Sequence, residues 1–430
     1  MAEIRPFRAL QYDTRRIPIQ EVVTQPYDKI TPSMRERYLA AHPNNLVRVL
    51  RPLDDTGIPE GVSPYQNAAR VWCDWRREGI VRRADEPALF AYYQRFSVPG
   101  AGQVLTRKAF VGLTRLEDYA NGVIFPHERT LAGPREDRLE LLRHTRTHFG
   151  QVFLLYSDPE RRAERAIEAE IAGEAPLSLR DEDDVEHMLW KVSRPQAIAG
   201  VCRLMSEGKL LIADGHHRYE TALAFRDEER RRSGDAGPFE WLMTTLVNME
   251  SPGLLVLPTH RVLGDLPSFD AARLLAQAAE FYEVRDVPDA GTLVRVLSEQ
   301  PASRPALGLV VPGAGKLLVL GEGLDPAALV PGVSPRYAAL DVVLLHRLIL
   351  GRCLGLSEEA VRQERHIRYL RDAAAAAADV EEGRAQACFL LRGTPLADVR
   401  DIAFGGGVLP QKSTDFFPKL LSGLVMYAED

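Results

Sequence analysis

The stretch "KLLIADGHHRYETALAF", residues 209–225, decides how the middle of this chain folds. Its apolar first half predicts a buried strand and its second half predicts a helix, so Asp214 to Arg218 lie where the strand meets the helix N-terminus. Glycine at position 215 permits the positive φ that such a tight turn needs. Free backbone N–H groups and the helix dipole favour an anion at this point.

The polar side chains of this turn are suited to holding a phosphate group. His216, His217 and Arg218 add hydrogen-bond donors, and an arginine can hold a phosphate through two parallel hydrogen bonds. Asp214 adds an acceptor that suits a hydroxyl group, a histidine or Mg²⁺. Because such groups are costly to bury without ligands, we predict a phosphate site here. The alternative is a capped helix that carries two ordinary histidines.

Strands and helices alternate along the chain, which predicts an α/β fold with helices covering a mixed sheet. Strands are expected at 88–98, 105–117 and 152–157, and an amphipathic helix that starts at residue 65 and ends at Gly79. We expect four parts: an N-terminal α/β part, a core with the phosphate site, a small α/β insertion with a hairpin, and a C-terminal helical part with an arm. Their bounds are 1–122, 123–265, 266–335 and 336–430.

The composition excludes several classes of protein. Of the 430 residues, 45% are hydrophobic and 27% charged, as in ordinary globular proteins. The formal net charge of −6 makes a nucleic-acid partner unexpected. The four cysteines form no CxxC pair, which argues against a disulfide framework or a structural zinc site. With no signal peptide and no apolar run of about 18 residues, we expect a cytoplasmic protein without a membrane partner.

Two further segments place histidines beside charged groups. In "FPHERT", residues 125–130, His127 and Glu128 form a second candidate site; the alternative is that they cap the following helix. In "LPTHR", residues 257–261, His260 and Arg261 follow an apolar run and offer further phosphate ligands. The alternative for that pair is an ion-paired strand end.

The C-terminal segment "GGGVLPQKSTDFFPK", residues 405–419, has the composition of an anion-binding arm. Its candidate ligands are Lys412, Ser413, Thr414 and Lys419. Gln411 stands where a P-loop would have glycine, so we predict an arm that folds over the site and not a Walker loop. Plain packing is the alternative.

Three other motifs are expected to carry no site. "PGAGKLL", residues 312–318, lacks P-loop spacing and predicts a hairpin turn. "HTRTH" places His144 and His148 four residues apart without the glutamate of a zinc motif, which predicts a solvated helix face. The acidic run "DEDDVEH", residues 181–187, lacks calcium-loop spacing and is expected to be a solvated lead-in.

Together these motifs closely resemble the DUF1015 family of bacterial and archaeal proteins. The resemblance spans nearly the whole chain. It rests on "IRPFRAL" with "QPYDKI", "FPHERTLAGPREDRLELL", "ADGHHRYETAL", "LPTHRVL" and "LPQKSTDFFPKLLSGL". More remotely, the DGHHR element resembles that of the free serine kinases of the ParB/sulfiredoxin-like superfamily. That resemblance implies a ParB/sulfiredoxin-like core in which this element binds nucleotide phosphates and a glutamate acts as base.

The resemblance implies a kinase that uses ATP or ADP with Mg²⁺ and phosphorylates a hydroxylated metabolite such as free L-serine. Asp214 would lie near the metal or the acceptor hydroxyl, with His217 beside it, and Glu128 would be the base. His127, Arg129 and Thr130 would contact the acceptor. The alternatives are a non-catalytic nucleotide-binding module of ParB type and a phosphate-ester hydrolase. A homodimer is compatible with the kinase and with both alternatives.

Overall fold

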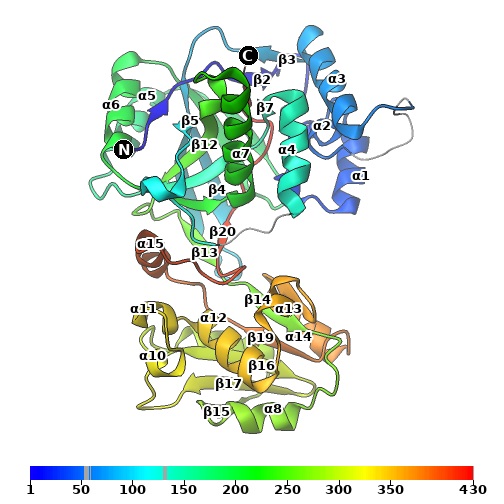
Figure 1. Cartoon of the computed structure of the whole chain (residues 1–430), viewed down its shortest axis with the longest axis vertical. Helices are drawn as coiled ribbons and strands as arrows, with labels where there is room; N and C mark the ends of the chain where they lie inside the picture. The colour runs from blue at the N-terminus through cyan, green and yellow to red at the C-terminus, as the bar shows by residue number, and fades with distance from the viewer. Residues whose placement is uncertain (53–57, 59, 129–132, 430) are drawn as a thin grey trace. The chain divides into compact units, whose positions relative to one another are not determined.

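The chain folds into two compact units, each with its own β-sheet (Figure 1). The computed structural model describes residues 1–52, 58, 60–128 and 133–429. Unit 1 comprises residues 1–126, 130–255 and 418–430, and unit 2 comprises residues 127–129 and 256–417. The α/β class with a mixed sheet, predicted from the alternation of strands and helices, is confirmed.

Unit 1 is built on a nine-stranded mixed sheet in the order β6-β11-β8-β12-β5-β4-β10-β9, with β1 paired to β5. The pairs β11–β6 and β12–β8 are parallel and the other pairs are antiparallel. The strands are β1 (Ile4–Arg5), β4 (Leu89–Ser97), β5 (Val104–Arg115), β6 (Ile124–Phe125), β8 (Val152–Tyr156), β9 (Leu177–Arg180), β10 (Glu186–Val192), β11 (Leu210–Asp214) and β12 (Trp241–Asn248).

Helices and two small sheets complete unit 1. Apolar residues of α5, α6 and α7 join the strands in one core, and α4 packs along α7. The helices are α1 (Pro32–Ala41), α2 (Val47–Leu50), α3 (Pro64–Arg77), α4 (Gly133–Thr145), α5 (Arg162–Ile171), α6 (Pro195–Ser206) and α7 (His216–Ser233). The small sheets pair β2 (Leu10–Tyr12) with β3 (Val81–Arg83) and β7 (Thr147–His148) with β21 (Tyr427–Ala428).

Unit 2 is built on a six-stranded antiparallel sheet in the order β15-β17-β16-β19-β14-β18. Its strands are β14 (His260–Leu263), β15 (Tyr282–Val287), β16 (Ala306–Val311), β17 (Ala314–Leu320), β18 (Ile367–Leu370) and β19 (Ala387–Leu390). Its helices are α8 (Ala271–Ala278), α9 (Ala290–Ser298), α10 (Pro326–Leu329), α11 (Pro335–Ala338), α12 (Asp341–Leu344), a π-helix (Leu345–Cys353), α13 (Glu358–Arg362), α14 (Ala373–Glu381) and α15 (Leu396–Phe404). Two short strands, β13 (Leu255–Leu257) and β20 (Asp415–Phe417), pair with each other.

The strand–turn–helix predicted around residue 214 is present as β11 and α7. The first four residues of β11 are buried, and the chain turns at Gly215 with a φ of 92°. A side chain at this position would be strained by the positive φ, and its Cβ would lie 3.1 Å from the Arg218 guanidinium. Glycine therefore lets Arg218 fold back against the turn.

Two of the three motifs expected to carry no site differ from expectation. The hairpin turn at "PGAGKLL" is confirmed between β16 and β17. The solvated helix face at "HTRTH" is wrong, because α4 ends at Thr145 and His148 lies in β7, where its side chain is 8% exposed. The solvated lead-in at "DEDDVEH" is correct for Glu182, Asp183 and Asp184, which are exposed, but wrong for Asp181, whose side chain is only 3% exposed.

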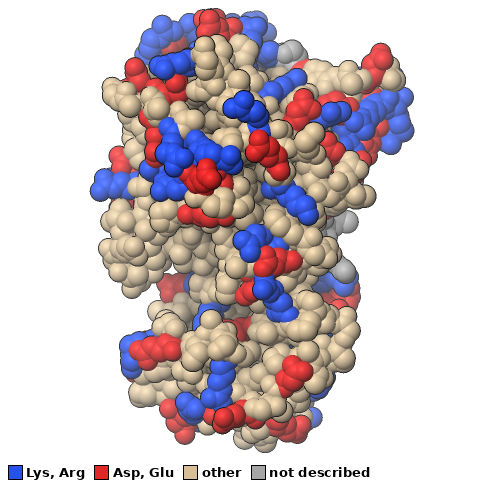
Figure 2. Space-filling view, turned by 90° about the vertical axis from the view of Figure 1, so that its left-hand side faces the viewer, with Lys and Arg blue, Asp and Glu red and all other residues tan. Residues whose placement is uncertain are grey.

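In the part of the chain that the structure describes, no helix combines the length and apolarity needed to cross a membrane. Figure 2 shows one face of the molecule, on which basic and acidic side chains are interspersed.

The close approach of Gly253 to β5 gives a test of the unit 1 packing. A Cβ at this residue would lie 2.1 Å from the backbone oxygen of Thr106, so Gly253→Ala must displace backbone. We expect Gly253→Ala to lower the free energy of unfolding by about 1–3 kcal/mol. The matched control is Gly200→Ala in α6, where a Cβ meets nothing within 4 Å; it should stabilise by about 0.5–1 kcal/mol. Equal urea midpoints for the two variants would contradict this packing.

Candidate functional site

The carboxylate of Asp214, at the end of β11, lies among positively charged groups of unit 1. Its Oδ2 is 3.3 Å from Arg218 Nη2 and its Oδ1 is 3.8 Å from Lys419 Nζ. Burial raises the pKa of Asp214, but the charges of Lys419, Arg218, Lys29 and His216 outweigh it and hold the pKa well below the ordinary value. The Asp214 carboxylate thus lies in a cluster of basic groups, with Arg218 and Lys419 in direct reach.

The turn itself offers further donors. His216 and His217 are the first two residues of α7, so the N–H groups of the first helical turn begin beside Asp214. Arg218 donates to the backbone oxygen of Gln151 as well as to Asp214, and its side chain is 15% exposed. A helix N-terminus with an arginine and a lysine beside it is an arrangement that binds anions.

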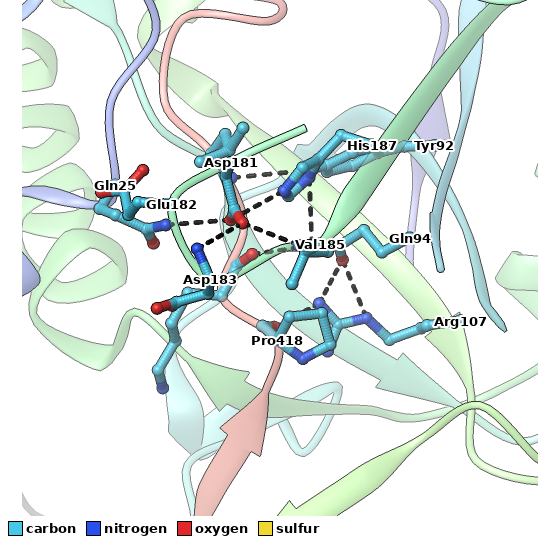
Figure 3. A network of polar contacts seen from close by, with 12 residues as sticks. Gln25, Tyr92, Gln94, Arg107, Asp181, Glu182, Asp183, Val185, His187 and Pro418 are labelled. Carbon is cyan, nitrogen blue, oxygen red and sulfur yellow. Dashed lines mark hydrogen bonds and ion pairs between the residues drawn. The ribbon is translucent and has the colours of Figure 1, made fainter. Parts of the chain in front are cut away.

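A buried polar network fixes the segment that carries Lys419 (Figure 3). Gln94 Nε2 donates to the backbone oxygen of Lys419 at 2.7 Å, and Gln94 accepts from Arg107 Nε at 3.1 Å. Arg107 also donates to the backbone oxygen of Pro418. These bonds place Lys419 against Asp214.

His187 continues this network toward the acidic run. Its Nε2 lies 3.0 Å from Asp181 Oδ2 and its Nδ1 lies 2.7 Å from the Tyr92 hydroxyl. Burial lowers the pKa of His187, so a neutral ring donates to Asp181 and accepts from Tyr92. Leu421 N–H in turn donates to the Tyr92 oxygen at 3.3 Å. Asp181, the first residue of the acidic run, is thus connected through His187 and Tyr92 to Leu421 in the C-terminal segment.

Buried polar atoms without partners lie around this site. Among the described residues, Arg107 Nη1 and both side-chain polar atoms of Gln151 have no hydrogen-bond partner. Arg107 is fully buried and interacts electrostatically with Asp214, while the Gln151 backbone accepts from Arg218. Burial lowers the pKa of Arg107 to about 10, so it stays charged at neutral pH. Unsatisfied buried groups of this kind are typical of ligand or water sites.

A cavity of about 60 Å³ opens beside Arg218 in unit 1. Tyr27, Arg138 and Phe149 line it together with Arg218, and the rest of the lining combines leucine side chains with the polar side chains of two threonines, a serine and a histidine. Arg138 lies over the Tyr27 ring at 4.3 Å and donates to a backbone oxygen at 2.6 Å. The cavity gives room for part of a ligand next to the turn.

A second group of candidates lies in unit 2 around Glu128. Glu128 forms a parallel β-bridge with Leu409, and its Oε1 accepts from Ser413 N–H at 3.1 Å. The Thr414 hydroxyl lies 2.7 Å from His127 Nε2 and 3.5 Å from Glu128 Oε1. Because Glu128 itself lies in a β-bridge, the alternative that it belongs to the first turn of the following helix is wrong. Segment 409–414 holds the Glu128 carboxylate.

His260 and Arg261 lie in β14 and bond to the backbone of unit 2. His260 Nδ1 accepts from Leu391 N–H at 3.2 Å. Arg261 is buried and donates to the backbone oxygens of Thr259, Gln411 and Lys412. A role for either residue as a phosphate ligand stays a prediction.

The structure thus brings the predicted site residues together in two groups, one in each unit. Arg129 and Thr130, predicted to contact the acceptor, lie outside the described residues. Within the described ranges no group of three or more His, Cys, Asp or Glu could hold a metal ion by itself. The group in unit 1 is Asp214, Gly215, His216, His217, Arg218 and Lys419; the group in unit 2 is His127, Glu128, His260, Arg261, Lys412, Ser413 and Thr414.

Several residues of the unit 1 site were missed by the sequence analysis. Arg107 lies two residues before Ala109 and four before Val111, so the three side chains share one buried face of β5. The alternation of faces along a strand could therefore have predicted that Arg107 points inward. Lys29 lies in the motif "QPYDKI", but nothing in its spacing predicts that it would act on Asp214. The contact between Gln94 and Lys419 joins residues 325 positions apart and has no local signal.

The arrangement of motifs is matched by a family profile over residues 4–343, described as "Protein of unknown function (DUF1015)". The chain belongs to the DUF1015 family. The predicted resemblance to that family is therefore confirmed. A comparison with curated proteins gives no match.

Solved structures similar to this DUF1015 protein include free serine kinase in complex with AMP, at 15% identity and a TM-score of 0.34, covering 68% of this chain and 83% of that one. A conserved hypothetical protein from Pyrococcus furiosus shares 15% identity at a TM-score of 0.33, covering 68% and 86%. C-terminally truncated SbnI from Staphylococcus aureus shares 8% identity at a TM-score of 0.34, covering 73% and 85%.

The buried His260 predicts a pH dependence of stability. Burial, with Arg261 nearby, lowers its pKa to about 4, against about 6.5 in an unfolded chain. Below pH 6.5 the unfolded chain therefore binds a proton that the folded chain does not, and the free energy of unfolding falls until about pH 4. Asparagine at position 260 keeps an acceptor for Leu391 N–H but does not titrate. We therefore expect His260→Asn to lose less stability than the wild type between pH 6.5 and pH 4, by an amount on the order of 3 kcal/mol.

Urea unfolding of wild type and His260→Asn at pH 7.5, 6.5, 5.5 and 4.5 measures this effect. The stability difference between the two proteins should be constant above pH 6.5 and should change in favour of the variant below it. A difference that stays constant down to pH 4.5 would show that His260 titrates alike in both states.

Proposed function

We propose that this protein is a small-molecule kinase that transfers a phosphoryl group from ATP or ADP to a hydroxylated metabolite such as free L-serine. The observation that carries the proposal is the cluster of basic groups at the N-terminus of α7. Arg218 Nη2 and Lys419 Nζ lie 3.3 Å and 3.8 Å from the Asp214 carboxylate, and Lys29 and His216 lower its pKa electrostatically. A phosphate chain of two or three charges is the kind of ligand that such a cluster at a helix N-terminus attracts.

Mg²⁺ fits this site only together with a nucleotide. Asp214 is one carboxylate among several cations, which by itself is a poor site for a divalent cation. Protein-bound Mg²⁺ commonly takes one or two carboxylates and completes its coordination with substrate phosphates and water. Asp214 is the proposed protein ligand, and the metal would supply neutralisation of the phosphate charge.

Glu128 is the proposed general base, on account of its surroundings in unit 2. Its Oε1 is held by Ser413 N–H, and its side chain is 18% exposed. In the proposed reaction the acceptor oxygen bonds to the terminal phosphorus, the bond from that phosphorus to the bridging oxygen breaks, and the hydroxyl proton passes to Glu128. The shortened nucleotide is the leaving group.

We further propose that the acceptor carries a hydroxyl group and that the protein is cytoplasmic. A base such as Glu128 suits a hydroxylated acceptor, because a hydroxyl group must be deprotonated when it attacks phosphorus. The four free cysteines suit a reducing cytoplasm.

Arg218→Lys tests the nucleotide site. Lysine keeps the charge but loses the planar fork that holds a phosphate through two hydrogen bonds. For the wild type, ADP or ATP with Mg²⁺ at about 100 times Kd should stabilise by about 2.7 kcal/mol in a thermal-shift assay. Arg218→Lys should lose most of this stabilisation.

The matched control is Arg230→Lys on the same helix, where the arginine pairs with Glu240 at 2.6 Å. Its nucleotide response should equal that of the wild type. If neither nucleotide stabilises the wild type, the kinase proposal fails. Stabilisation by inorganic phosphate or a phosphate ester alone would then favour a hydrolase.

Glu128→Gln tests the base. The amide keeps the size of the side chain but cannot take a proton, so we expect turnover with L-serine or another hydroxylated acceptor to fall by about 10²–10⁴-fold. Nucleotide stabilisation should remain unchanged. The control is Glu382→Gln, an exposed carboxylate of unit 2 that pairs with Arg384. Unchanged turnover in Glu128→Gln would remove Glu128 from the mechanism.

A further inference from the structure

One peptide group in unit 2, between Lys412 and Ser413, connects Arg261 to Glu128. Its carbonyl oxygen accepts from Arg261 Nη2 at 3.0 Å, and its N–H donates to Glu128 Oε1 at 3.1 Å. In a planar trans peptide the C=O and N–H groups point to opposite sides. A change in the hydrogen bond to the carbonyl oxygen therefore rotates the peptide plane and changes the direction of the N–H. We propose that Arg261 is a positioning residue for Glu128 and acts through this peptide group. The inference rests on the proposed role of Glu128 as base.

Arg261 is itself fixed in place. It lies in β14, between β18 and β19, and is 1% exposed. The guanidinium lies 5.2 Å from the centre of the Tyr369 ring and donates to Thr259 and Gln411 as well as to Lys412. Burial lowers its pKa to about 10, opposed by Tyr369 and Glu128, so it is charged at neutral pH. A rigid, charged fork of this kind can orient a peptide group.

The peptide needs such support because its backbone is unusual. Lys412 has a φ of 56°, in the left-handed region that residues other than glycine rarely adopt. Arg261 contacts the carbonyl oxygens on both sides of this residue. Ser413 Oγ donates to the Pro410 oxygen at 2.5 Å, and Thr394 Oγ1 donates to the Ser413 oxygen at 2.8 Å. The turn is thus held in one conformation from three sides.

The consequence at Glu128 is an asymmetric carboxylate. Oε1 faces Ser413 N–H, the Thr414 hydroxyl and, at 3.7 Å, His127 Nε2. The charged or titratable groups that interact with Glu128 include His127, Arg261 and Tyr369. Fixing Oε1 sets the orientation of the whole carboxylate, which is how positioning supports catalysis.

The Ser413 amide reports on this connection directly, without reference to activity. In full-length protein labelled with ¹⁵N-serine, its NMR signal is identified by its loss in Ser413→Ala. In Arg261→Lys we expect this signal to shift and its hydrogen exchange to accelerate by about tenfold or more, because the N–H loses its fixed direction. In the same variant kcat should fall by about 10–100-fold while the KM for nucleotide stays unchanged.

The matched control is Arg368→Lys on the adjacent strand β18, where an exposed guanidinium pairs with Asp379 at 2.9 Å. Neither the Ser413 signal nor kcat should change there. An unchanged Ser413 signal in folded Arg261→Lys overturns the proposal. If Arg261→Lys does not fold, Glu128→Gln decides: the Ser413 signal must shift when its acceptor changes, and an unchanged signal overturns the proposal.

The same experiments separate this inference from the kinase proposal. A Ser413 signal that responds to both variants supports the connection between Arg261 and Glu128 even if the wild type transfers no phosphoryl group. That combination would reject the proposed function alone. A kinase whose kcat is lost in Glu128→Gln but unchanged in Arg261→Lys supports the base and rejects the positioning role.

Discussion

The balance of charge around Asp214 is the constraint on which unit 1 depends. A partly buried carboxylate is costly unless cations face it, and here Arg218 and Lys419 approach Asp214 from segments 201 residues apart. Lys419 is held by Gln94, Arg107 is buried behind it, and His187 with Asp181 and Tyr92 completes the support. Much of the buried polarity of unit 1 therefore serves to keep opposite charges together at the start of α7.

Sequence reasoning predicted what local patterns determine. The apolar run before Asp214, the glycine at 215 and the helix after it gave the strand–turn–helix, and alternation gave β4 and β5. It failed where distant segments meet. Asp181 looks like part of a solvated acidic run, and only the fold places His187 and Gln25 against it. His148 has helical spacing from His144, but Arg146 adopts a φ of 47° and the chain enters a strand.

In unit 2, the basic pair His260 and Arg261 bonds to the backbone. Arg261 donates to three carbonyl oxygens, and His260 Nδ1 accepts a hydrogen bond from Leu391 N–H. The sequence shows only a basic pair beside an apolar run and cannot reveal these bonds. Two of the bonds of Arg261 reach the carbonyl oxygens of Gln411 and Lys412, about 150 positions away. A buried cation that shapes a turn is a structural element that composition does not reveal.

The path of the chain has a consequence for its synthesis. The chain passes between the units four times, and unit 1 resumes at residue 418 after unit 2. Strand β21 pairs with β7, and Lys419 reaches Asp214 only from this returning segment. During translation, domains tend to fold as their residues emerge, and every strand of the nine-stranded sheet precedes residue 249. The contacts of Lys419 with Asp214 and of Arg107 with the Pro418 oxygen therefore form only after the whole of unit 2 has been synthesised.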